Sequence, residues 1–205
     1  VERNTHHVPG RLLDVGCGTG YFTHHMQRSG WRVKGLEPDE NARAIAHSRF
    51  GLDISSTHQL FSLSETFDVI TLWHVLEHVH QLNAYLEKFR EILDQKGILL
   101  IAVPNYTSRD ARTYGSDWAA YDVPRHLWHF SPASMHYLMK KHGYRIGKKY
   151  GMIFDPIYVS MLSEKYRQSR MGAIRGGFQG MLSNLSSLGD IDRASSIVDI
   201  CKKSS

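Results

Sequence analysis

The residues best suited to chemistry begin with three glycines, Gly16, Gly18 and Gly20, in the string LLDVGCGTG. Glycine allows a tight backbone turn and the close approach of a ligand, because it has no side chain to obstruct either. Glu37 follows about 20 residues later, at the end of the next apolar run, where a carboxylate can hold the two hydroxyls of a ribose. The spacing therefore predicts a site for an adenosine-containing ligand.

The residue at position 21 separates a dinucleotide from other ligands of this kind. A dinucleotide fingerprint needs a small residue there so that a helix N-terminus can approach a pyrophosphate. This chain has the bulky Tyr21, so a ligand without phosphates, whose ammonium and carboxylate need polar partners such as Asp14, fits better. An NAD-dependent dehydrogenase is disfavoured by Tyr21 and by the lack of a second nucleotide-binding half in the sequence. A structural turn that binds no ligand is the remaining alternative.

Four histidines are candidates for proton transfer: His74, His78, His126 and His129. An imidazole whose pKa is near neutrality can remove a proton from a hydroxyl or an amine. A histidine in a packed, partly polar crevice is, however, more often a hydrogen-bonding group than a base. We interpret Glu77, between the first two, as a structural carboxylate in the first turn of a helix, where the macrodipole favours it.

The string HVLEH at 74–78 also matches the H-x-x-E-H signature of a family of zinc peptidases. That chemistry requires both histidines on one well-formed helix. The apolar run FDVITLW just before the string predicts a buried strand, which places His74 at the carboxyl end of that strand, where ligands of open α/β sheets bind. We therefore predict no metal site.

The elements that position these residues follow from the apolar pattern. Short apolar runs alternate with stretches of helical period, as in β-α-β units around a parallel sheet. Strands are predicted over 11–15, 31–37, 52–55, 67–73, 97–104, 144–153 and 195–203. Helices are predicted over 21–29, from after residue 37 to Phe50, over 82–93 and over 131–143, with one amphipathic helix and a mobile Gly/Ser-rich segment within 155–190. The fold class is α/β, a Rossmann-like seven-stranded sheet with helices on both faces.

The stretch from Asn105 to Phe130 is polar and aromatic, and we predict a binding loop there. Trp118 and Trp128 either line an apolar acceptor pocket, which we favour, or cap the core. Arg125 either binds an acceptor carboxylate or phosphate, or pairs with a neighbouring acid.

Composition limits the classes of protein that remain. The chain has 205 residues, of which 41% are hydrophobic and 22% are charged, which fits one soluble domain. The formal charge is +5, but the basic residues come in pairs, so we predict solvated faces and no nucleic-acid partner. No run of about 18 apolar residues suggests a membrane span. Two distant cysteines favour a cytoplasmic setting, and the first residue, Val1, suggests that an N-terminal segment is missing.

Four strings, taken in order, resemble motifs of the class I S-adenosylmethionine-dependent methyltransferases: LLDVGCGTG, GLEPDENA, FDVITLWHVLEHV and KGILLIAVPN. YDVPRHLWHFSP is further similar to the small-molecule branch that includes the ubiquinone-biosynthesis O-methyltransferases. The resemblance implies a mostly parallel sheet whose last strand is antiparallel, S-adenosylmethionine as cofactor, and a small-molecule acceptor methylated on oxygen or nitrogen. A catalytically inactive cofactor-binding module that acts through a protein partner is the alternative.

The resemblance also implies roles for single residues. Those assigned to the cofactor are Asp14, Gly16, Cys17, Gly18, Gly20, Glu37, Pro38, Asp39, His58, Gln59, Trp73 and His74. Of these, Glu37 is assigned to the ribose hydroxyls, while Trp73 and His74 border the methyl group. The family often has an acid after its third strand to meet the adenine amine; this chain has none, and His58 or Gln59 takes that place. The expected organisation is a single domain, with a cofactor half at 1–104, an acceptor loop at 105–130 and a C-terminal half at 131–205.

Overall fold

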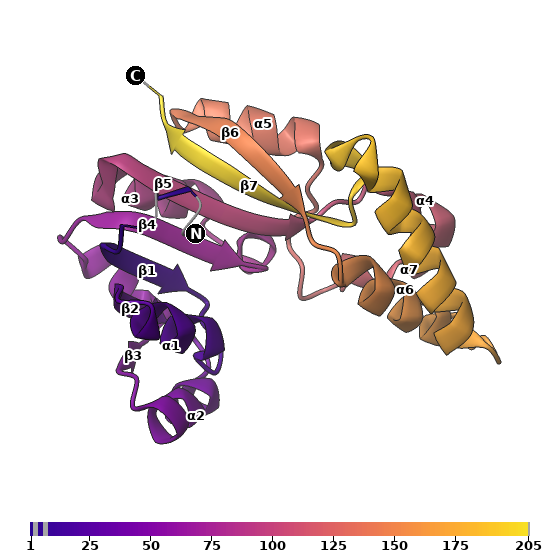
Figure 1. Ribbon diagram of the computed structural model, residues 1–205, viewed down its shortest axis with the longest axis horizontal. Helices are drawn as coiled ribbons and strands as arrows, with labels where there is room; N and C mark the ends of the chain where they lie inside the picture. The colour runs from indigo at the N-terminus through magenta and orange to yellow at the C-terminus, as the bar shows by residue number, and fades with distance from the viewer. Residues whose placement is uncertain (2–3, 6–7, 205) are drawn as a thin grey trace.

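The computed structural model describes residues 1, 4–5 and 8–204. They form a seven-stranded sheet in the order β3-β2-β1-β4-β5-β7-β6 (Figure 1). β7 pairs in antiparallel fashion with both β5 and β6, whereas the other neighbours are parallel. The predicted fold class is confirmed, including the antiparallel last strand.

The elements lie close to their predicted places. The strands are β1 Arg11–Val15, β2 Arg32–Leu36, β3 Ile54–Ser55, β4 Phe67–Trp73, β5 Leu93–Pro104, β6 Tyr144–Gly151 and β7 Ser196–Lys203. The α-helices are α1 Tyr21–Arg28, α2 Glu40–Phe50, α3 Leu82–Ile92, α4 Arg109–Tyr114, α5 Pro132–Lys141, α6 Asp155–Tyr166 and α7 Gly172–Leu188. Short 3-10 segments include η2 Thr57–Ser62, η3 Leu76–His78, η4 Gly115–Asp117 and η5 Ala119–Tyr121. β5 begins earlier than predicted, because Leu93 pairs with Phe67 across an irregularity in register.

The core lies on both faces of the sheet. On one face, Leu86 and Phe89 of α3 and Met139 of α5 pack against strand residues such as Ile70. On the other face, Met26 of α1 packs against a separate set of strand residues that includes Leu12 and Val69. Side chains that alternate along a strand point to opposite faces, so β4 supplies both layers and is buried as the sequence predicts.

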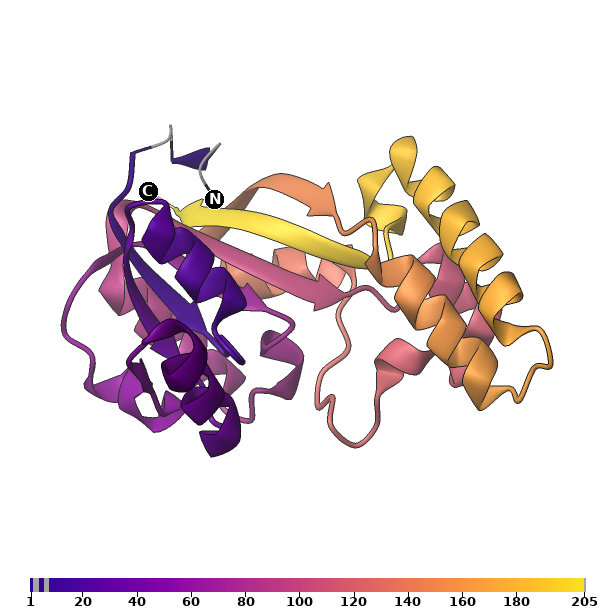
Figure 2. The same cartoon turned by 60° about the horizontal axis from the view of Figure 1, so that its bottom comes forward.

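Two stretches differ from the sequence prediction. The segment 105–130 is not a simple loop, because it contains α4 and two 3-10 turns, and Trp118 within it is only 1% exposed. The segment 155–190 contains two helices, so the expected mobile Gly/Ser-rich segment is wrong: it forms most of α7. Figures 1 and 2 show α6 and α7 running side by side with α4 at one end of the molecule.

α6 and α7 make a closely packed helical hairpin, because two glycines of α7 face the backbone of α6. A Cβ at Gly176 would lie 2.5 Å from the Cα of Met161, and a Cβ at Gly180 would lie 2.4 Å from the Cα of Ile157. Any larger side chain at these two positions would force the helices apart. Within the described residues, no helix is both long and apolar enough to cross a membrane.

Candidate active site

The glycine loop after β1 adopts a backbone that glycine favours. Gly16, Gly18 and Gly20 have φ values of 69°, 54° and 83°. A Cβ at Gly20 would meet the side chains of Leu52 and Ala46, so that glycine allows α1 to pack on α2. A Cβ at Gly18 would meet no atom within 4 Å, which leaves open space over the loop for a ligand.

Glu37 joins the loop to the end of β2. One of its carboxylate oxygens, Oε2, accepts the Gly18 N–H at 2.8 Å, and Oε1 accepts the Asp39 N–H at 3.0 Å. The side chain is largely buried, at 8% exposure. The loop and the acid thus lie together as the sequence predicts, and the carboxylate is held in one orientation before any ligand arrives.

A cleft of ≈ 730 Å³ opens beside Glu37, and we call it the cofactor cleft. Its walls come from the carboxyl ends of the strands, where open α/β sheets bind their ligands. Its lining residues include Val15, Gly16, Glu37, Pro38, His58, Phe61, His74, Val75, His78 and Tyr85. Glycines without a Cβ, a fixed carboxylate and aromatic walls suit an adenosyl group.

Some residues assigned to the cofactor have other partners in the structure. Asp14 is buried beneath the loop, where it accepts hydrogen bonds from Thr23 and Thr71, both at 2.8 Å. Burial raises the pKa of Asp14 to about 6, although both hydroxyl contacts lower it. Asp39 caps α2 by accepting the Ala42 N–H at 2.7 Å.

Trp73, Cys17 and Gln59 lie away from the cofactor cleft. Trp73 packs edge-on against Phe22 of α1, with 5.3 Å between ring centroids, and lines a separate cavity on that side of the sheet. Cys17 is half-buried, and burial raises the pKa of its thiol to about 12, so the thiol is neutral at physiological pH. Gln59 is exposed, whereas the adjacent His58 lines the cleft. The roles of all three residues toward a cofactor stay predictions.

His74 lies between two carboxylates directly after β4. Its Nδ1 is 3.2 Å from Oε1 of Glu77, and its Nε2 is 2.9 Å from Oδ2 of Asp155 at the start of α6. Burial lowers the pKa of His74, but the two carboxylates together outweigh burial and raise it to about 9. The imidazole is therefore a cation at neutral pH and cannot accept a proton there.

The helix expected around Glu77 is only the short 3-10 segment η3, so a helix macrodipole does not explain this acid. Glu77 is fully buried and contacts His74. His74 itself has a positive φ of 54°, which turns the chain away from β4. HVLEH is thus a strand end and a turn, and the single helix that a zinc peptidase needs is not formed by these residues.

A second cavity of ≈ 330 Å³, the acceptor pocket, lies on the other side of His74. His74 lines both the acceptor pocket and the cofactor cleft. The other walls come from the 105–130 segment and from α6, and include Glu77, Ala120, Asp122, Arg125, His126, Asp155, Tyr158, Val159, Leu162 and Tyr166. The two cavities therefore meet at one side chain, at the carboxyl end of the central strand β4.

The remaining candidate histidines differ in environment. His126 lines the acceptor pocket, its Nδ1 is 2.8 Å from the Ala120 carbonyl, and burial lowers its pKa. His78 lines the cofactor cleft, with Nδ1 3.0 Å from the Arg125 carbonyl. His129 is exposed outside both cavities and contacts the Tyr121 carbonyl at 3.0 Å. Of the four, His126 best combines a neutral ring with a position in the acceptor pocket.

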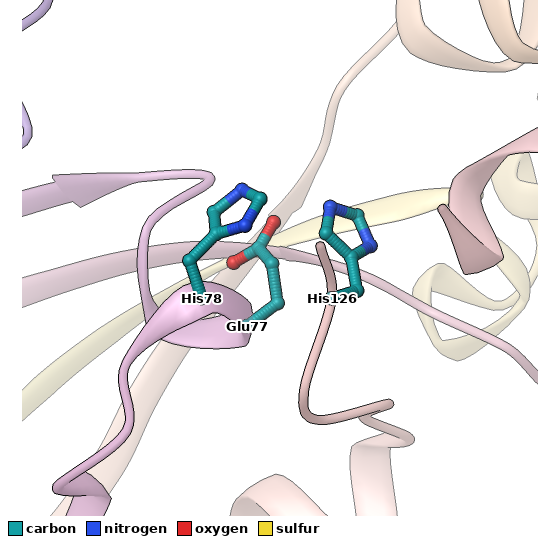
Figure 3. Close-up of side chains that lie close together, drawn as sticks. All are labelled: Glu77, His78 and His126. Atoms are coloured by element: carbon teal, nitrogen blue, oxygen red, sulfur yellow. The ribbon is translucent and has the colours of Figure 1, made fainter. Parts of the chain in front are cut away.

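Glu77, His78 and His126 come together between the two cavities (Figure 3), with one donor atom of each within 4.8 Å of the others. Oε2 of Glu77 is buried and has no hydrogen-bond partner among the described residues. The spacing is compatible with one metal ion held by a carboxylate and two imidazoles. The absence of a metal stays a prediction from the sequence, and metal analysis of the purified protein tests it.

Trp118, Trp128 and Arg125 have different partners in the structure. Trp118 caps the core rather than lining the pocket, because its Nε1 donates to the buried Asp110 at 2.8 Å. Trp128 donates to the Val79 carbonyl at 2.8 Å and is partly exposed. Arg125 pairs with Asp122 at 2.7 Å on the rim of the acceptor pocket. The neighbouring-acid interpretation of Arg125 therefore describes the structure.

Sequence reasoning missed Asp155, Tyr158 and Tyr166, which line the acceptor pocket from α6. They lie more than 80 residues beyond His74, as the separation of 81 between His74 and Asp155 shows. The apolar period in this stretch predicted a helix, but nothing local to Asp155 indicated its distant partner.

A family model described as a methyltransferase domain matches residues 2–148. The chain belongs to the S-adenosylmethionine-dependent methyltransferase family. The ubiquinone biosynthesis O-methyltransferase of Azorhizobium caulinodans is 27% identical over 160 residues, which cover 72% of this chain and 63% of that protein. The human mitochondrial ubiquinone biosynthesis O-methyltransferase is 32% identical over 173 residues, covering 73% of this chain and 47% of that protein. The chain thus spans about half to two thirds of the length of these curated relatives.

Solved structures of methyltransferases share the fold. A SAM-dependent methyltransferase from Archaeoglobus fulgidus is similar with a TM-score of 0.63 and 20% identity, covering 95% of this chain and 86% of that chain. A Burkholderia thailandensis 1,6-didemethyltoxoflavin-N1-methyltransferase, solved with bound 1,6-didemethyltoxoflavin and S-adenosylhomocysteine, has a TM-score of 0.60 and 16% identity, covering 96% of this chain and 72% of that chain. In the present chain, α6 and α7 lie beyond residues 2–148, which the family model matches.

Proposed function

We propose that this methyltransferase transfers a methyl group from S-adenosylmethionine to an oxygen or nitrogen of a small, partly apolar acceptor. The observation that carries the proposal is the meeting of the cofactor cleft and the acceptor pocket at His74. Methyl transfer needs the nucleophile in line with the methyl group and a site closed to water. The bound cofactor would supply an activated methyl on a sulfonium, so the protein's main task is to position the acceptor.

The charges around His74 suit a cationic cofactor. Glu77 and Asp155 each carry a negative charge when ionised, and His74 between them carries one positive charge at neutral pH. The cluster therefore has a net charge of −1 where the two cavities meet, which attracts a positive sulfonium. Asp155 comes from α6, so the hairpin contributes directly to this charge.

We assign the base to His126. Its Nδ1 is 2.8 Å from the Ala120 carbonyl, so Nε2, which lies 3.8 Å from Oδ2 of Asp122, is the nitrogen that would accept a proton from an acceptor hydroxyl or amine. Its lowered pKa keeps it neutral at physiological pH. Tyr158, Val159 and Leu162 form an apolar wall that favours an aromatic or otherwise apolar acceptor. The O-methyltransferase names of the relatives make a phenolic hydroxyl the first acceptor to test.

Isothermal calorimetry with S-adenosylhomocysteine tests the cofactor, and we expect saturable binding to one site. Incubation with S-adenosylmethionine and a panel of catechols, phenols and aromatic amines tests the acceptor by the appearance of S-adenosylhomocysteine. A folded sample that binds neither form of the cofactor contradicts the proposal. Cofactor binding without turnover of any acceptor, together with co-purification of a partner protein, favours the inactive-module alternative.

A further inference from the structure

The α6–α7 hairpin distributes its side chains in the opposite way to an ordinary surface helix. The buried positions of α7 are Gly176, Gly180 and Ser183, all of them small. The buried positions of α6 are Pro156, Ser160, Ser163 and Glu164. An amphipathic helix of a water-soluble protein buries its large apolar residues and exposes its polar ones. This hairpin packs small and polar residues inside and must expose its apolar residues elsewhere.

The exposed apolar residues of α7 form one stripe along the helix: Ile174, Phe178, Met181, Leu185 and Leu188, with exposures from 59% to 82%. Their spacing of four and three residues keeps them on a single helix face. Three more exposed apolar residues lie nearby. Phe154 precedes α6, Tyr158 lies within α6, and Met171 lies between the two helices. Contiguous apolar surface of this extent marks a site of interaction rather than ordinary solvent exposure.

The charged side chains of the hairpin are mostly basic. Residues 155–188, from the start of α6 to the end of α7, contain four basic side chains, Lys165, Arg167, Arg170 and Arg175, and two acids, Asp155 and Glu164, so their net charge is 4 − 2 = +2. Glu164 is buried and accepts a hydrogen bond from Tyr114. Among the described residues, Arg170 and Arg175 have no acidic partner. An apolar stripe flanked by exposed arginines is complementary to a surface that is apolar within and negatively charged at its edge.

We propose that the α6–α7 hairpin docks this methyltransferase onto an anionic lipid bilayer, with the apolar stripe of α7 inserted at the level of the headgroups. The hairpin lies on the membrane and does not span it, since neither helix is long enough. A second copy of the chain is a poorer occupant, because two hairpins of charge +2 would repel each other.

Vesicle sedimentation of the whole chain tests the docking. We expect the protein to sediment with vesicles of phosphatidylcholine and phosphatidylglycerol, and far less with phosphatidylcholine alone. The triple variant Ile174→Gln, Phe178→Gln, Leu185→Gln should stay in the supernatant. Tyr137→Gln is the matched control, because Tyr137 is 71% exposed on α5, and it should sediment like the parent. Calorimetry with S-adenosylhomocysteine on each variant shows whether the cofactor cleft is intact.

A charge variant sharpens the test. Arg170→Gln with Arg175→Gln should lower the partition coefficient on anionic vesicles by on the order of tenfold at low salt, while the exposed pair Arg28→Gln with Arg32→Gln should not. Sedimentation that is unchanged in the triple variant overturns the proposal. A parent protein that ignores all vesicles, and whose dimer is broken by the triple variant, overturns it in favour of a second copy. Either result leaves S-adenosylhomocysteine binding, and thus the proposed function, separately measurable.

Discussion

The sheet with its flanking helices and the α6–α7 hairpin bury opposite kinds of side chain. α3 buries Leu82, Leu86 and Phe89 against the sheet, whereas α7 buries Gly176 and Gly180 against α6. The first region is stabilised by apolar burial, which is the dominant favourable contribution to folding. The second relies on close backbone packing and buried hydrogen bonds. The difference shows that one part is built to be a core and the other to present an apolar outer surface.

The comparison predicts that each region can be disrupted alone, and the largest effect is expected at Asp110. This buried side chain accepts hydrogen bonds from Trp118 at 2.8 Å, from Ser183 at 2.8 Å and from Ser195 at 2.6 Å. Asp110→Ala leaves these donors buried without an acceptor and should lower the free energy of unfolding by about 3–5 kcal/mol. Urea unfolding measures the loss, and hydrogen exchange should place it in α4 and α7.

Asp117→Ala is the matched control, because Asp117 is partly exposed and pairs with Arg167 on the surface. We expect it to cost less than about 1 kcal/mol. S-adenosylhomocysteine affinity should be retained in both variants while the sheet remains folded. If Asp110→Ala lost S-adenosylhomocysteine affinity together with stability, the two regions would unfold as one unit.

The next largest effect is expected at Glu37, which tests the other region. Glu37→Gln keeps the size of the side chain but removes the negative charge at the cofactor cleft. Loss of a charge-assisted hydrogen bond should weaken S-adenosylhomocysteine binding roughly 10- to 100-fold. Calorimetry measures the affinity, and Glu40→Gln, which alters an exposed acid in the first turn of α2, is the control. Equal affinities in the two variants would refute the role of Glu37.

A pair of glycines gives a smaller and more specific test. Gly18 and Gly51 have φ values of 54° and 66°, and a Cβ at either would meet no atom within 4 Å. Alanine at each position should therefore cost a similar amount of stability, about 1–2 kcal/mol, from the left-handed backbone alone. Only Gly18→Ala should also weaken S-adenosylhomocysteine binding, because the Gly18 N–H donates to Glu37, which lines the cofactor cleft. Similar affinities in both variants would place the cofactor elsewhere.

The smallest effect is expected at Asp155, the contact between the two regions. Asp155→Asn removes a carboxylate from His74, so the pKa of His74 should fall below the parental value of about 9. Because the folded pKa lies above the ordinary value of 6.5, the stabilisation is complete below about pH 6.5 and is lost as the pH rises through 9. The parent should therefore be more stable than the variant at pH 6 and nearly equal to it at pH 10.

Proton NMR titration of the His74 ring measures this change directly. An unchanged titration in Asp155→Asn would show that Glu77 alone sets the charge of His74. A lowered pKa with unchanged S-adenosylmethionine affinity would limit the effect of the hairpin to the acceptor side.

Local patterns were sufficient for the cofactor side of the molecule. The glycine string needs positive φ values, and an apolar run such as 67–73 needs a buried strand, wherever the rest of the chain lies. The strand order and the antiparallel last strand came from the resemblance, and the sheet confirmed them. Residue types alone misplaced Trp118, because a buried partner such as Asp110 cannot be seen from the neighbouring sequence.

The sequence by itself determined the strands, the glycine turn and the position of Glu37, because each depends on backbone preferences and on the period of nearby residues. Only the tertiary structure decided that Asp155 contacts His74, that α6 lines the acceptor pocket, and that the stripe of α7 faces outward. The stripe has the same helical spacing whether it is buried or exposed. Gly176 and Gly180 turn toward α6, and that packing leaves the apolar residues of α7 on the surface.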